Sequence, residues 1–202
     1  VLKLEHNSHY ILYTMHHIAS DGWSMGIFSK ELSALYNAYK DNNANPLPPL
    51  KFQYADYAMW QKGWLKDEVL GKELNFWKSQ LAGIPALHSL PLDGSRPGRQ
   101  TFEGRQLSVR FEQALSDRLY RLCDQYEVTL FMFLETALAL LVGRYSNQSD
   151  VVIGTPMAGR THKDVEDLIG FFINPIAMRT RLSAQQSFSE LLAENKKQIS
   201  IN

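Results

Sequence analysis

The chain has 202 residues, enough to bury one large hydrophobic core or two smaller ones. Its 21 basic and 21 acidic residues give a formal net charge of zero, so charge offers no argument for nucleic acid or an acidic membrane as a partner. Aromatic residues make up 11% and charged residues 21% of the chain, as in ordered globular proteins. The single cysteine, Cys123, excludes an internal disulfide and suits a reducing cytosol, which predicts a cytoplasmic protein.

The N-terminal part predicts two strands, at about residues 1–5 and 10–17, and then a helix at about 23–40. The second strand is rich in aromatic and β-branched residues, whereas apolar residues recur at helical spacing in the helix. Asp21 or Ser24 can cap the start of this helix.

A stretch rich in proline and asparagine, residues 41–49, is the best candidate for a boundary in the chain. It divides residues 1–48 from residues 49–202. Two helices are predicted after it, at about 52–65 and 67–82.

The second half of the chain predicts strands alternating with helices, which favours an open α/β sandwich. The expected elements are a half-buried strand at 107–111, helices at 114–126 and 129–146, strands at 151–153 and 173–181, and a final helix from Phe188. Thr129 is expected to cap the second of these helices. The apolar run from Leu130 to Val142 is too short to span a bilayer, so we interpret it as a buried helix. Cys123 falls in the apolar pattern of its helix and is expected to be a buried, inert thiol.

Two adjacent histidines, His16 and His17, followed by Asp21 and Gly22, are the most informative residues. Because successive side chains of a strand point to opposite faces, the predicted strand would separate the two rings. A neutral histidine is well suited to accept a proton near pH 7. The residues alone leave two interpretations open: a proton-transfer site, or a core histidine followed by a helix-capping aspartate.

Four stretches, in this order, resemble the condensation domains of nonribosomal peptide synthetases, which share a site with chloramphenicol acetyltransferase. The first is the HHxxxDG pattern of the histidine pair, and the others are residues 54–60 (YADYAMW), 154–160 (GTPMAGR) and 169–179 (IGFFINPIAMR). The chain departs from the family at Pro175, where threonine is usual.

The resemblance implies an α/β fold of the chloramphenicol acetyltransferase type, a two-layer sandwich of which the chain would span parts of two lobes. Residues 1–48 would be the C-terminal part of the first lobe with the HHxxxDG site, and residues 49–202 the linker helices and most of the second lobe. The start at Val1 without a methionine suggests an internal fragment. Such a fragment is expected to be inactive by itself, and poorly soluble or oligomeric, because its first strands would lack sheet neighbours.

The implied reaction is amide formation between a donor thioester and the amine of an acceptor. Both substrates would arrive on the 4'-phosphopantetheine arms of carrier proteins, with no cofactor bound directly by the chain. The implied partners are upstream and downstream peptidyl carrier proteins and an adenylation domain, in a multimodular enzyme of secondary metabolism.

The resemblance assigns the catalytic position to His17 and a structural role to His16. Whether His17 acts as a base or orients the amine stays open. The family pairs the aspartate of the motif with an arginine; for Asp21, the candidate is Arg160, with Arg179 and Arg110 as alternatives.

Other residues are expected to shape the site. Gly22 allows close approach of the backbone, and its amide could donate to a developing oxyanion. Trp23 and Ser24 are expected to pack and cap, and Asn174 to line a tunnel or bridge the lobes. Residues expected to fix the linker helix are Tyr54, Asp56 and Trp60.

Several other functions fit the sequence less well. Adjacent strand histidines diverge, and no HExxH or CxxC occurs, which argues against a metal site. No GxSxG nucleophile elbow is present for a serine hydrolase. The histidine pair argues against a heterocyclization domain, whose counterparts are aspartates. An epimerization domain, an acyltransferase that uses coenzyme A, and a non-catalytic module that docks carrier proteins remain as alternatives.

Overall fold

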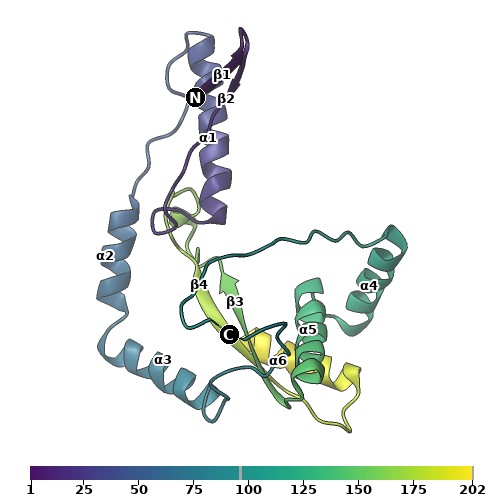
Figure 1. Cartoon of the computed structure of the whole chain (residues 1–202). Helices are drawn as coiled ribbons and strands as arrows, with labels where there is room; N and C mark the ends of the chain where they lie inside the picture. Colours follow the sequence, from purple (N-terminus) through teal and green to yellow (C-terminus); the bar gives the residue numbers. More distant parts are fainter. Residues whose placement is uncertain (96, 202) are drawn as a thin grey trace. The chain divides into compact units, whose positions relative to one another are not determined.

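The computed structural model describes residues 1–95 and 97–201. Its elements, in chain order, are β1 (Leu2–Glu5), β2 (Ser8–Tyr10), α1 (Gly22–Lys40), α2 (Tyr54–Trp64), α3 (Asp67–Gln80), α4 (Gln113–Tyr126), α5 (Leu130–Ser146), β3 (Asp150–Met157), the 3₁₀ helix η1 (Lys163–Val165), β4 (Asn174–Arg181) and α6 (Phe188–Ile201) (Figure 1). The chain forms two compact units. Unit 1 comprises residues 1–76 and 156–176, and unit 2 comprises the rest of the described chain.

All the predicted helices are present, and two of them begin at the predicted caps. Asp21 caps α1 by accepting a hydrogen bond from the Ser24 N–H at 2.8 Å, and Thr129 caps α5 by accepting one from the Met132 N–H at 3.2 Å. Both caps satisfy amides that have no partner within the first helical turn. Local sequence is enough to define these helix starts.

The predicted strand at residues 10–17 is wrong for most of its length. Strand β2 ends at Tyr10, residues 11–16 have no regular structure, and a turn follows in which the Ala19 N–H donates to the His16 carbonyl at 2.9 Å. β2 pairs antiparallel with β1, and no strand among the described residues pairs with residues 11–16. Aromatic and β-branched residues favour a strand, but a strand also needs a partner for its backbone hydrogen bonds.

The predicted strand at residues 107–111 is also wrong, for the same reason. This segment has no regular structure, and its apolar residues Leu107 and Val109 are 88% and 74% exposed. Within residues 1–95 and 97–201, no strand hydrogen-bonds to it. Alternation of apolar and polar residues indicates a half-buried strand only where a sheet accepts it.

The predicted strands around residues 151–153 and 173–181 are confirmed as β3 and β4, which are hydrogen-bonded neighbours in one sheet. Residues 158–173, between the two strands, contain η1 and belong to unit 1. Part of this segment forms the core of unit 1: Val165, Leu168 and Phe172 are buried together, with two tyrosines of α2 packed against them, Tyr54 and Tyr57.

In unit 2, α5 packs against α4 and α6. Cys123 of α4 is buried as predicted, and its burial, with a smaller contribution from the Asp124 charge, raises the pKa of its thiol. No helix of the described residues is by itself long and apolar enough to cross a membrane; α4 and α5 reach that length and composition only as a pair, bent by 100°.

A buried carboxyl group lies in α5. Glu135 is 6% exposed, and its Oε2 accepts a hydrogen bond from the Asn195 side chain of α6 at 3.1 Å. The same amide also donates to the hydroxyls of Thr136 and Thr180. The other carboxyl oxygen, Oε1, has no hydrogen-bond partner among the described residues. Burial raises the pKa of Glu135, and the single bond from Asn195 only partly opposes this.

Replacing Glu135 with glutamine should therefore increase the free energy of unfolding at pH 7, by about 1 kcal/mol. A raised pKa means that the folded chain holds the proton more tightly than the unfolded chain, so stability is lost as pH rises from the ordinary value of 4.5 through the folded value. The glutamine variant has no carboxyl group at this position to ionise, so it does not lose stability in this way. Urea unfolding at several pH values between about 4 and 8 measures the effect. Glu112→Gln, at an exposed glutamate, is the matched control, and a stability difference between Glu135→Gln and wild type that does not grow with pH would contradict the prediction.

Candidate active site

The two histidines are held by different backbone contacts. The Nδ1 atom of His17 lies 2.7 Å from the carbonyl oxygen of Ser20. Because a carbonyl can only accept, Nδ1 carries the proton, and a neutral ring then has its lone pair on Nε2. His16 has the opposite arrangement, since its Nδ1 accepts a hydrogen bond from the Ile18 N–H at 3.0 Å. The rings thus differ in tautomer, although they do not lie on the predicted strand.

The ring of His17 is exposed and packs against an aromatic side chain. It meets the ring of Phe171 edge-on, with centroids 5.3 Å apart and an interplanar angle of 84°. The two contacts of His17 therefore come from the residue before the α1 cap and from the segment that precedes β4.

Asp21 forms a buried ion pair with Arg160, the candidate partner in the sequence. Nη2 of Arg160 donates to Oδ1 of Asp21 at 3.2 Å, and the side chains of Arg160 and Asp21 are 3% and 1% exposed, respectively. The pair joins residues 139 positions apart, both within unit 1. Of the alternatives, Arg179 binds Asp150 at 2.6 Å instead, and Arg110 is exposed. The pairing with Arg160 is confirmed.

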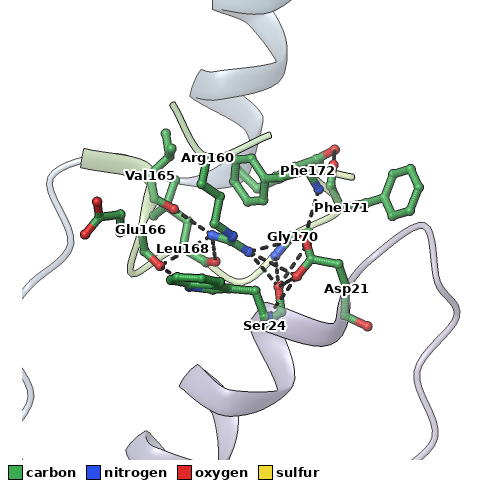
Figure 2. A network of polar contacts seen from close by, with 12 residues as sticks. Asp21, Ser24, Arg160, Val165, Glu166, Leu168, Gly170, Phe171 and Phe172 are labelled. Atoms are coloured by element: carbon green, nitrogen blue, oxygen red, sulfur yellow. Dashed lines mark hydrogen bonds and ion pairs between the residues drawn. The ribbon is translucent and has the colours of Figure 1, made fainter. Parts of the chain in front are cut away.

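The guanidinium of Arg160 also organises its own loop. Nη1 donates to the carbonyl oxygens of Val165 at 2.6 Å and Leu168 at 2.8 Å, and Cζ lies 4.0 Å from the ring centroid of Phe172. Figure 2 shows the guanidinium between these carbonyls on one side and Asp21 and Ser24 on the other. Arg160 therefore fixes the η1 loop and ties it to the start of α1 through charge-assisted hydrogen bonds.

Asp21 is buried but stays ionised, because several neighbouring groups donate hydrogen bonds to its carboxylate. Burial by itself raises its pKa, but hydrogen bonds from the Ser24 hydroxyl, the Ser24 and Phe172 amides and Arg160 outweigh it, so the pKa of Asp21 is lower than usual. A carboxylate with these partners holds structure rather than exchanging protons. Through these bonds, Asp21 joins the start of α1 to Arg160 and to the backbone at Phe172.

The remaining predicted site residues lie around this ion pair or apart from it. Gly22 begins α1, and a Cβ placed there would meet nothing within 4 Å, so tight packing does not explain the glycine. Trp23 donates from Nε1 to the Glu166 carbonyl at 3.1 Å. Asn174 is exposed at the start of β4, and its side chain has no hydrogen bond to Asp21 or Arg160.

The sequence by itself indicates no role for Gly170, Tyr57 and Phe172, although all three fall inside the quoted stretches. A Cβ at Gly170 would overlap the ring of Tyr54, whose hydroxyl donates to the Phe171 carbonyl at 2.7 Å. The ring of Phe172 contacts those of Tyr54 and Tyr57, with centroids 5.2 and 4.7 Å apart. As expected, Asp56 helps to fix α2, because its Oδ2 accepts from the Gln53 N–H at 2.8 Å. Residues of all four stretches thus meet in unit 1.

Gly159 is needed for two independent reasons, which makes Gly159→Ala a test of this packing. Its φ of +66° is in the left-handed region, and a Cβ would overlap the Phe172 carbonyl. We expect the variant to lose about 2–3 kcal/mol of unfolding free energy, measured by urea denaturation. The matched control is Gly154→Ala in the same motif, where a Cβ meets nothing within 4 Å. Equal effects of the two substitutions would contradict this assignment.

Metal ligands do not gather at this site. Among residues 1–95 and 97–201, no group of three or more histidine, cysteine, aspartate or glutamate side chains could hold a metal ion.

The family model of the condensation domain matches residues 1–201 of the chain. Among curated proteins, a linear gramicidin synthase component of Brevibacillus parabrevis is 47% identical over 193 residues, covering 96% of this chain and 4% of that protein. Malpinin synthetase of Mortierella alpina is 43% identical over 182 residues, covering 90% of this chain and 2% of that protein. The chain thus spans a few per cent of the length of these relatives.

Solved structures give the same picture of the fold. The X-domain from teicoplanin biosynthesis has a TM-score of 0.84 and 32% identity, covering 92% of this chain and 42% of that one. A four-domain nonribosomal peptide synthetase bound to AMP and glycine has a TM-score of 0.81 and 28% identity, covering 93% of this chain and 14% of that one. Together with the mixture of helices and strands, these matches confirm the predicted α/β fold class.

Proposed function

Since the chain belongs to the condensation domain family, we propose that it contributes the catalytic histidine for amide-bond formation in nonribosomal peptide synthesis. The donor would be an acyl or peptidyl thioester and the acceptor an aminoacyl thioester with a free amine. The observation that carries this proposal is the hydrogen bond from His17 Nδ1 to the Ser20 carbonyl, because it leaves the Nε2 lone pair of an exposed ring available to the amine.

In the proposed reaction, the acceptor nitrogen attacks the carbonyl carbon of the donor thioester, a C–N bond forms and the C–S bond breaks. The amine loses one proton, which Nε2 of His17 accepts, and the donor thiolate leaves and is protonated. A thioester is already activated, so no covalent enzyme intermediate is needed. Holding the two groups together can remove up to about 7–11 kcal/mol of the barrier in ideal cases, and a general base adds about 10²- to 10⁴-fold.

The other motif residues would support this step. The ring of His16 would stabilise the turn at residues 16–19 by accepting a hydrogen bond from the Ile18 N–H. The ion pair of Asp21 with Arg160 would hold the segment that carries His17. Gly22 opens α1 without a side chain, which leaves room for substrate to approach the helix N-terminus, where the amide could donate to the developing oxyanion.

The proposal includes partners and context. The substrates would be carried on 4'-phosphopantetheine arms of upstream and downstream carrier proteins, with an adenylation domain in the same cytoplasmic enzyme. Residues 1–48 would belong to the first lobe of the domain and residues 49–202 to the linker helices and second lobe, with Asn174 lining the tunnel. The relationship to the gramicidin synthase component supports this context.

A single-turnover experiment tests the function. The protein that contains this chain is mixed with a donor-loaded and an acceptor-loaded carrier protein, and mass spectrometry follows the peptidyl product on the acceptor. Transfer from a coenzyme A thioester alone would favour a free acyltransferase, and exchange of the α-proton with solvent deuterium would favour an epimerization domain. Carrier binding without any product would favour a docking module.

A further inference from the structure

The hydroxyl of Ser24 is a buried junction of three segments of unit 1. Ser24 has no exposed surface, and its Oγ lies 2.7 Å from Asp21 Oδ1 and 2.9 Å from Arg160 Nη2. The same oxygen lies 2.8 Å from the carbonyl oxygen and 3.1 Å from the amide nitrogen of Gly170. Figure 2 shows these contacts converging on the one side chain.

These contacts use the whole hydrogen-bonding capacity of a hydroxyl, which has one proton and two lone pairs. Ser24 accepts from the Gly170 amide and from Arg160, and its single proton is shared between two close acceptors, the Asp21 carboxylate at 2.7 Å and the Gly170 carbonyl at 2.8 Å. Removal of this oxygen would leave a buried amide without its partner and would remove the direct contacts between α1 and Gly170. Helix capping alone does not require this, because Asp21 is the cap.

Both contacts of the His17 ring depend on residues next to those that Ser24 binds. The ring donates to the carbonyl of Ser20, which precedes Asp21, and it meets the ring of Phe171, which follows Gly170. Ser24 therefore links the segment at Ser20 to the segment at Phe171, and the His17 ring contacts both.

We propose that Ser24 is a positioning residue for His17: its hydroxyl holds the Ser20 carbonyl and Phe171 at the spacing that keeps the proton on Nδ1 and the lone pair on Nε2. The consequence for amide formation rests on the proposed function, but the effect on the ring does not. A misplacement of about 1 Å in a catalytic group can lower a rate a hundredfold.

The test compares Ser24→Ala with Ser24→Thr, which keeps a hydroxyl, and with the control Ser33→Ala. Ser33 is an exposed serine of the same helix, and its hydroxyl donates to the Ser29 carbonyl at 2.7 Å. Long-range proton–nitrogen NMR spectra report the tautomer of His17, and single-turnover assays report the rate. Both measurements use the protein that contains this chain, with labelled histidine for the spectra. In Ser24→Ala, we expect His17 to lose its single Nδ1–H tautomer and the rate to fall about tenfold to a hundredfold. Ser24→Thr should recover most of both, and Ser33→Ala should match wild type.

An unchanged tautomer in Ser24→Ala would overturn the proposal, including where the melting temperature falls, since the role would then be structural only. If this variant does not fold, Ser24→Cys replaces it, because cysteine fills similar space but hydrogen-bonds weakly. A shifted tautomer in a protein whose wild type forms no amide would leave the role of Ser24 intact and reject the proposed function.

Discussion

Replacement of His17 by alanine is expected to lower the single-turnover rate of amide formation by about 10²- to 10⁴-fold, which is the usual contribution of a general base. The fold should survive, because the ring is exposed and, among the described residues, has one hydrogen bond and one aromatic contact. Rates with saturating donor and acceptor carrier proteins, together with a thermal melt of each variant, measure both parts of the expectation.

The matched control is His16→Ala. That ring also has one hydrogen bond, from the Ile18 N–H, but its lone pair is occupied by that bond. We expect less than about a tenfold loss of rate from this change. A wild-type rate in His17→Ala would remove His17 from the mechanism, and equal losses in the two variants would point to the turn as a whole.

Replacement of Asp21 by alanine is expected to destabilise the fold by about 3–5 kcal/mol, the usual effect of leaving one member of a buried ion pair without its partner. Arg160 would keep its charge with a side chain only 3% exposed. Activity should be lost as well, because the N–H groups of Ser24 and Phe172 both lose their acceptor. Urea unfolding compares the variant with wild type.

The effect of Asp21 should also depend on pH. Its pKa is lower than the ordinary 3.8, so its contribution to stability is present in full above that value and is lost as the pH falls through the folded pKa. The difference between wild type and Asp21→Ala should therefore shrink in acid.

A control for charge removal is Glu68→Ala, which breaks an exposed pair with Lys72 and should change stability by less than about 1 kcal/mol. Unchanged stability of Asp21→Ala with complete loss of turnover would favour a direct chemical role for the carboxylate instead. The two outcomes separate a residue that holds the loop from one that takes part in the reaction.

The helices and their caps could be predicted from the sequence because they depend on contacts between near neighbours. Asp21 reaches an amide three residues ahead, and so does Thr129. The motif stretches could also be recognised, since their residues follow one another along the chain. The family and the candidate catalytic histidine could therefore be predicted from the sequence alone.

The strands at 10–17 and 107–111 could not be decided in this way. Their composition and alternation favour strands, but a strand is completed by another segment, and none of the described residues supplies one. The tertiary structure also selected Arg160 over Arg179 and Arg110, because charge alone does not say which distant arginine reaches Asp21. The sequence shows which side chains carry the opposite charge, but only the folded structure shows which of them lies within reach of Asp21.

For Ser24 and Glu135, local sequence predicts the position of the residue in its helix, whereas tertiary structure decides the partners of its side chain. The sequence by itself determined that Ser24 lies in the first turn of a helix and that Glu135 interrupts an apolar run. Only the tertiary structure placed the hydroxyl against Gly170, 146 residues away, and the carboxyl group against Asn195, 60 residues away. The physical reason is that hydrogen-bond satisfaction of a buried group depends on whichever distant segment closes over it, whereas helix periodicity and capping are set within a few residues.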